Sequence, residues 1–100
     1  MTTTNNNVAQ TITRQIGNRA FVMWGAKNLM AGANNLSFKV GRNAAKITHV
    51  EITLNARDLY DVAFRSVRGL KVRDISDFAD IDVANLVGLI ERETGMYASL

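Results

Sequence analysis

The sequence predicts an α+β fold: one small domain in which an antiparallel sheet of about five strands carries an N-terminal and a C-terminal helix on one face. Three observations lead to this prediction. Some segments alternate apolar and polar residues, other segments repeat apolar residues at helical spacing, and the helical segments lie near the two ends of the chain. The length of 100 residues suits one hydrophobic core and not two.

The first predicted element is a short amphipathic helix. Residues 1–7 are of low complexity and offer nothing to bury, so a disordered tail is expected there and the folded domain is expected over 8–100. Asn6 or Asn7 is placed to cap the helix, and Gly17 is placed to end it. Its apolar residues recur every four positions over about two turns, at Val8, Ile12 and Ile16.

Three strands are predicted next. Residues 19–24 are rich in aromatic and β-favouring types, so we expect a strand there, followed by a turn-rich loop through residue 35. Residues 36–40 and 48–54 alternate apolar and polar side chains, which predicts two strands with one buried and one solvated face. A polar loop over 41–46 joins them.

The segment from Asp58 to Val67 fits a helix or a strand by periodicity. A strand is favoured because two β-rich runs, 65–68 and 70–73, flank Gly69, which suits a hairpin or a bulged bend. Residues 55–58 are expected to form one helical turn before it.

The last predicted element is the clearest helix of the chain. Its apolar residues recur at i, i+3, i+4 and i+7, at Val83, Leu86, Val87 and Ile90. Asp80 or Asp82 is placed to cap it, and Gly95 to end it.

The composition excludes much familiar enzyme chemistry. There is no cysteine and one histidine, His49, and no glycine spacing matches a phosphate-binding loop or a dinucleotide fingerprint. His49 and Glu51 lie two apart on one strand face, but a structural metal usually needs about four ligands. The acidic run 74–82 lacks the spacing of a calcium loop. We therefore expect no enzyme, no cofactor and no metal.

The chain has neither a membrane-length apolar run nor a basic N-terminus with an apolar stretch behind it. Its longest unbroken apolar run, 20–24, is far too short to span a bilayer. The expected location is therefore the cytoplasm, with no membrane partner.

Positive charge is concentrated in one part of the chain. Residues 1–50 hold six bases and no acid, whereas residues 51–100 hold six bases and nine acids. Such asymmetry indicates contact with nucleic acid or another polyanion, unless the fold interleaves the two halves. The first expected cluster of binding residues lies at the Gly69 bend and consists of Arg65, Arg68, Lys71 and Arg73. A second cluster in two loops consists of Lys27, Arg42 and Lys46. Trp24 is expected as an aromatic platform beside these charges, with a place in the core as the alternative.

Several segments in order resemble a family of small uncharacterised proteins encoded by bacteriophages and bacterial mobile elements. They are Gly17–Arg19, Gly25–Asn28, Leu36–Lys39, Ile52–Asn55, Asp58–Val62, Arg68–Gly69 and Glu93–Leu100. Trp24 and Ala63 depart from the pattern, where a smaller polar residue and an acid are typical. The resemblance implies a protein of the bacterial host cytoplasm and brings no catalytic residue.

Two functional hypotheses follow. The first is a non-catalytic phage or mobile-element protein that engages nucleic acid, or a host complex that handles nucleic acid, through its Arg/Lys surface. The alternative is an inhibitor of a host defence or nuclease complex, of the anti-CRISPR type, that acts by protein–protein docking. A homodimer through a sheet edge is a further expectation, because an open small sheet exposes its edges.

Overall fold

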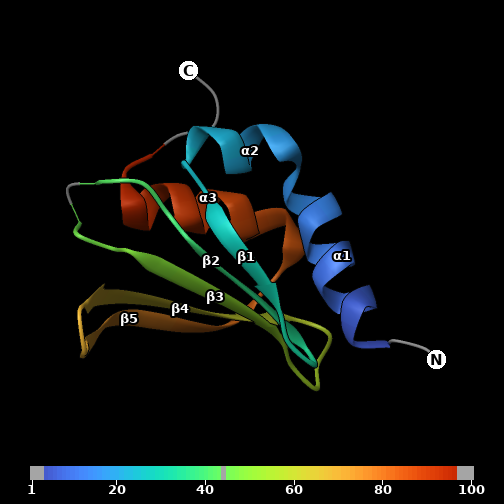
Figure 1. Ribbon diagram of the computed structural model, residues 1–100. Coiled ribbons are helices and arrows are strands. Elements are labelled where there is room, and N and C mark those ends of the chain that lie inside the picture. The colour runs from blue at the N-terminus through green and yellow to red at the C-terminus, as the bar shows by residue number, and fades with distance from the viewer. Residues whose placement is uncertain (1–3, 44, 97–100) are drawn as a thin grey trace.

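The computed structural model describes residues 4–43 and 45–96 and confirms the α+β prediction. Two helices precede five strands, and a third helix follows them (Figure 1). In chain order the elements are α1 (Thr4–Ile16), α2 (Asn18–Met23), β1 (Lys27–Ala31), β2 (Asn35–Lys39), β3 (His49–Leu54), β4 (Tyr60–Arg68), β5 (Lys71–Ile81) and α3 (Val83–Thr94).

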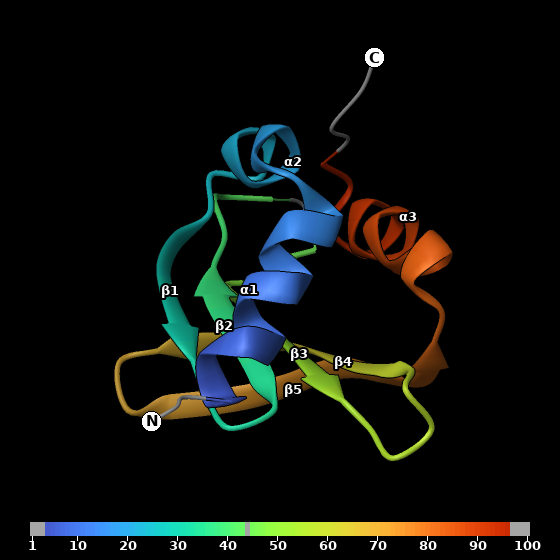
Figure 2. The same ribbon diagram turned by 90° about the vertical axis from the view of Figure 1, so that its right-hand side faces the viewer.

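The strands form one antiparallel meander, in the order β1-β2-β3-β4-β5, so β1 and β5 are its edges. The helices lie on the same side of this curved sheet (Figure 2). The alternation that predicted β2 and β3 is the observed burial pattern: Phe38, Val50 and Ile52 are buried under the helices. Self-association through an edge strand stays a prediction.

The prediction of a strand over 19–24 is wrong, because Asn18–Met23 form α2 and Trp24 caps it. The loop expected after it through residue 35 is also wrong in part, because it contains β1. Phe21 and Trp24 are both buried, whereas Val22 between them is exposed. Residues three apart share a face of a helix, but they lie on opposite faces of a strand. The aromatic residues of this segment are therefore explained by their packing in the core and not by a β-strand.

Helix α1 is longer at its start than the apolar stripe suggested. It begins at Thr4, so the predicted boundary of the tail at residue 7 falls inside the helix, while residues 1–3 lie outside the described residues. Gly17 follows it with a φ of 91° and separates it from α2.

The bend at Gly69 is the predicted hairpin, and the ambiguous segment before it is a strand. Arg68 pairs with Lys71 across a two-residue turn, in which Gly69 takes a φ of 61°. A glycine at the first central position suits such a turn. Residues 55–58, expected as a helical turn, instead form a turn held by Asn55, whose Oδ1 accepts from the backbone N–H groups of Arg57 and Leu59.

The predicted caps of the last helix are present. Asp82 accepts a hydrogen bond from the Ala84 backbone N–H, and Gly95 takes the left-handed conformation at the other end. Asp80, the other candidate cap, lies in β5 and forms an ion pair with Arg57 at 3.1 Å.

The core lies between the helices and one face of the sheet, and Trp24 is at its centre. The Trp24 ring is fully buried and stacks on Phe38, with 6.2 Å between ring centroids. Its indole Nε1–H donates to the Met96 carbonyl at 3.1 Å, which ties α2 to the chain after α3. Gly41 donates its N–H to the Trp24 carbonyl at 2.8 Å.

Candidate functional site

The end of the β4–β5 hairpin continues the core face of the sheet beyond the helices. Along β4, Val62, Phe64 and Ser66 alternate as buried residues on that face. Arg68 is next in the alternation, and residues directly opposite each other in an antiparallel pair share a face. Ser66 pairs with Arg73 and Arg68 with Lys71, so these cations project on the helix side of the sheet.

The loop between β2 and β3 brings Lys46 to the same place. Asn43 holds this loop: its Nδ2 donates to the carbonyls of Gly41 and Ile47, and its Oδ1 accepts from the Ile47 N–H. Lys46 takes a φ of 62°, which is uncommon for a residue with a side chain. The Asn43 hydrogen bonds flank Lys46 and support this conformation.

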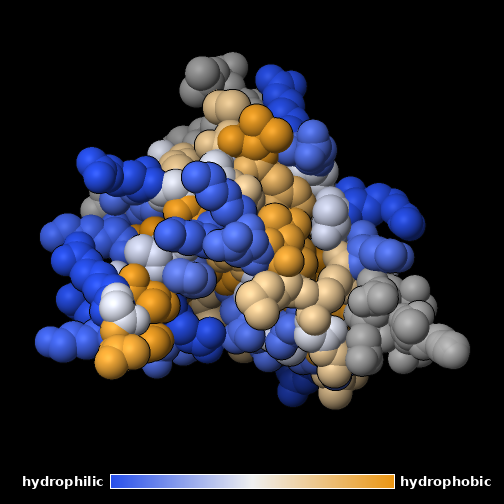
Figure 3. Space-filling model, in the orientation of Figure 1, coloured by the Kyte–Doolittle hydropathy of each residue, from blue (hydrophilic) through white to orange (hydrophobic). Residues whose placement is uncertain are grey.

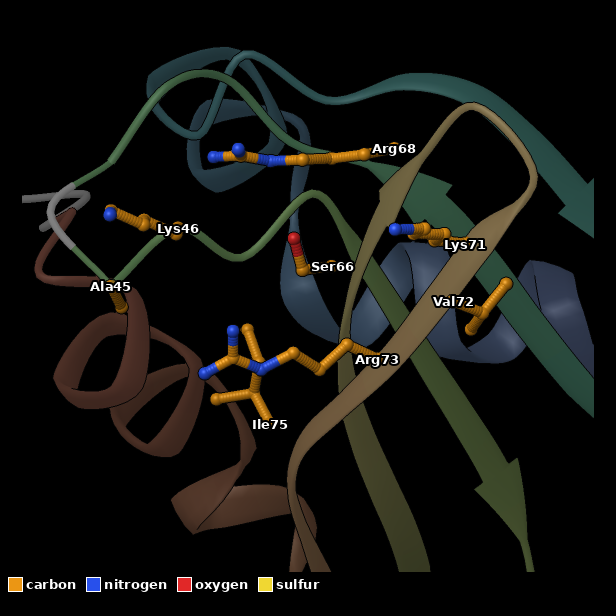
Figure 4. A pocket seen from close by; sticks show the side chains of 8 residues that line it. All are labelled: Ala45, Lys46, Ser66, Arg68, Lys71, Val72, Arg73 and Ile75. Carbon is orange, nitrogen blue, oxygen red and sulfur yellow. The ribbon is translucent and has the colours of Figure 1, made fainter.

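These residues surround a hollow of about 550 Å³, which we call the Ser66 hollow. Figure 4 shows the Ser66 side chain near the centre of the view, with Lys46 to its left, Lys71 to its right, Arg68 above it and Arg73 below it. The hollow is lined by Ala45, Lys46, Ser66, Arg68, Lys71, Val72, Arg73 and Ile75.

A second hollow, of about 500 Å³, adjoins the first and is called the loop hollow. Lys46 and Arg68 line both of them. The loop hollow adds Lys39 and Arg42 to the basic surface.

The positive charge of these hollows is not neutralised by neighbours. Across residues 4–43 and 45–96, no Asp or Glu lines either hollow, and none of the lining cations is in an ion pair. Uncompensated cations that converge on a concave surface raise the local potential and attract anions. The cations that line the two hollows are Lys39, Arg42, Lys46, Arg68, Lys71 and Arg73.

Arg65 does not belong to this cluster, although its place beside the bend predicted that it would. It lies on the opposite face of the sheet, between two carboxylates. Its Nη1 donates to Glu51 at 3.0 Å and its Nε donates to Asp74 at 3.1 Å. The hydrogen bond that Arg65 donates to Glu51 is the main reason that the pKa of Arg65 is raised, so Arg65 links neighbouring strands rather than being a free cation.

The remaining predicted contacts are divided between the surface and the core. Lys27 is exposed at the start of β1 and pairs with Lys39, but it lines neither hollow. Trp24 is buried, so the hypothesis of an aromatic platform at that position is wrong. The packing of the aromatic ring against Phe21 and Phe38 explains its place.

Lys39 and Ser66 are among the lining residues that the sequence did not predict. Lys39 lies in the predicted strand 36–40, where a lysine on the solvated face is ordinary and does not indicate a binding site. Ser66 lies in a segment that periodicity alone left open between helix and strand. Only the paired register shows that Ser66 faces Arg73.

His49 and Glu51 share the outer face of β3, as their spacing predicted, but they form no site together. Glu51 is engaged by Arg65, and His49 Nδ1 lies 2.7 Å from the Thr48 hydroxyl. Within the described residues, no group of three His, Asp or Glu side chains is placed to hold a metal ion.

We expect His49 to make stability fall as the pH is lowered through about 6.5. Burial, and then the charge of Lys39, lower the pKa of His49, and Arg65 is its cross-strand neighbour. The unfolded chain therefore binds more protons near the ordinary histidine pKa, so the free energy of unfolding decreases as the pH falls through that window. Urea unfolding at pH 7.5 and 5.5 measures this decrease, and His49→Gln should reduce it. An unchanged decrease in the variant would assign it to other groups.

Comparison with protein-family models, with curated proteins and with solved structures finds no match to this chain. In the described part of the chain, none of the helices has both the length and the hydropathy of a membrane-crossing segment.

Proposed function

We propose that this chain is a non-catalytic nucleic-acid-binding protein of the phage or mobile-element type that its sequence resembles. The observation that supports this proposal is the pair of adjoining hollows, which share Lys46 and Arg68 and hold no acid among their described lining residues. The cations are grouped along a surface, and a polyanion with regularly spaced charges is the partner that such a surface suits.

The geometry favours a nucleic-acid backbone over an isolated anion. The two hollows lie side by side, with Lys46 and Arg68 shared between them. Successive phosphates of one strand can therefore contact different cations. Arginine binds phosphate through a planar pair of N–H donors, and Arg42, Arg68 and Arg73 provide three of them.

The proposal is tested by titrating a fluorescent single-stranded oligonucleotide and its duplex with the protein at several salt concentrations. Backbone binding by about four cations gives a slope of log K against log salt of roughly −3.6 for the duplex and roughly −2.8 for the single strand. Failure of both to bind at tens of micromolar and low salt would show that the proposal is wrong.

A protein partner is the second candidate, and one observation favours it. Leu70 is fully exposed at the end of the hairpin and Val72 is 63% exposed. Figure 3 shows hydrophobic atoms at this end of the hairpin with hydrophilic residues around them. Exposed apolar residues beside charges are typical of a protein interface, as an inhibitor of a host defence or nuclease complex would need.

Leu70→Ser separates these two functions without removing charge. Phosphate contacts do not use the Leu70 side chain, so the salt-dependent binding of oligonucleotides should be unchanged. Docking on a protein would be weakened, which a pull-down from a nuclease-treated bacterial lysate measures. A partner that survives nuclease treatment and is lost with Leu70→Ser would favour the inhibitor.

A further inference from the structure

Ser66 is a largely buried polar residue whose hydroxyl has no hydrogen-bond partner among the described residues. It is 9% exposed, and no hydrogen bond joins its Oγ to any residue that the structure describes. Thr94, the other buried polar residue in the described chain, donates its hydroxyl to the Ile90 carbonyl at 2.7 Å. Buried polar groups are nearly always hydrogen-bonded, so the partner of the Ser66 hydroxyl is water or a ligand.

The free hydroxyl opens into the Ser66 hollow. In the described residues, no side-chain oxygen or nitrogen that is sealed from solvent lacks a partner. The Ser66 Oγ is therefore within reach of a group in the hollow, and Figure 4 shows it between the surrounding cations. A hydroxyl donor among ammonium and guanidinium groups suits a ligand with several acceptor oxygens and negative charge.

The ligand that fits these groups is a terminal phosphate on a nucleotide. A phosphate monoester carries about −1.5 to −2 at neutral pH, and four cations line this one hollow. Val72 and Ile75 add apolar wall to it, where a base or a ribose can pack. The volume of about 550 Å³ is ordinary for a small-molecule site.

We propose that the Ser66 hollow binds the terminal phosphate of a nucleic-acid strand, and that the strand continues through the loop hollow. Ser66 donates its hydroxyl hydrogen to a phosphate oxygen, while Lys46 and Arg73 neutralise the charge. This inference rests on the proposed nucleic-acid binding and adds to it a preference for strand ends.

The test compares three fluorescent single strands of one sequence, with a 5′-phosphate, a 3′-phosphate or hydroxyls at both ends. We expect one of the phosphorylated strands to bind roughly tenfold more tightly than the hydroxyl strand, since charged hydrogen bonds are strong. Inorganic phosphate at millimolar concentration should reduce that preference.

Ser66→Ala should remove most of the preference, because the phosphorylated strand loses the hydroxyl donor while every cation remains. Arg65→Gln, on the outer face of the same strand β4, is the matched control and should keep the preference. Thermal unfolding of each variant verifies that the fold is retained.

The outcomes separate this inference from the function on which it rests. Equal binding of all three strands by the wild-type protein overturns the terminal-phosphate site and leaves backbone binding intact. A preference that Ser66→Ala retains also overturns it. Failure of every strand to bind overturns both proposals.

Discussion

Trp24→Ala is expected to lower the midpoint of thermal unfolding by roughly 15 to 30 °C. Truncation of a buried tryptophan costs about 3 to 5 kcal/mol, and a domain of this size has a free energy of unfolding of roughly 5 to 15 kcal/mol. The variant loses the stack on Phe38 and the edge contact with Phe21, and it leaves the Met96 carbonyl without its indole donor. No rearrangement of α2 can refill a space of that size.

Circular dichroism during heating measures the effect, since the variant has no tryptophan to follow. Val22→Ala is the matched control, because Val22 lies on the exposed face of the same helix and should change the midpoint by little. In the wild-type protein, Trp24 fluorescence should be blue-shifted and insensitive to added oligonucleotide. A Trp24→Ala variant as stable as Val22→Ala would contradict the position of this ring in the core.

Strands β2 and β3 were predictable from sequence because their burial follows local alternation, whereas β1 has no buried residue and was expected as a loop. Phe38, Val50 and Ile52 alternate with polar residues, and the antiparallel pairing of neighbours follows from short connections. Asp82 and Gly95 marked the ends of α3 for equally local reasons, since a cap is determined by the backbone beside it.

Helix α2 was not predictable in this way because its sequence is short and almost entirely apolar. Over six residues, aromatic and β-branched types indicate a strand, and only the joint burial of Phe21 and Trp24 shows helical periodicity. The packing of two rings against Phe38 outweighs the local preference. That preference is weak and depends on tertiary context.

The candidate site was predictable only as two sets of cations, one near Gly69 and one in loops that include Arg42 and Lys46. Arg65 and Arg68 are three apart on β4, so they project to opposite faces, and Arg65 meets Glu51 and Asp74 on one of them. Lys46 reaches the hairpin because Asn43 shapes a loop far away in sequence. Which cations come together in this way depends on the register of the strands, and the distribution of charge along the sequence does not reveal that register.

The double variant Lys46→Gln/Arg68→Gln should weaken nucleic-acid binding more than any other pair of charge removals. These two residues line both hollows, so the nucleic acid loses contacts with cations in each hollow. Charged hydrogen bonds contribute about 1.5 kcal/mol or more each, so the loss is roughly 3 kcal/mol, or about a hundredfold in affinity. The salt slope should fall in magnitude by about 1.4 for a single strand. Fluorescence anisotropy at low salt measures both quantities.

A matched pair of single variants decides whether nucleic-acid affinity depends on the position of a cation or on the net charge of the protein. Arg65→Gln and Arg68→Gln each remove one positive charge from β4, but only Arg68 lines the hollows. Arg68→Gln should weaken binding about tenfold and Arg65→Gln hardly at all. Arg65→Gln should instead lower the free energy of unfolding by up to about 1 kcal/mol, because its partners are partly exposed and a surface ion pair contributes little. Equal losses of affinity in the two variants would mean that binding follows the overall charge of the protein, and the two hollows would then have no special part in it.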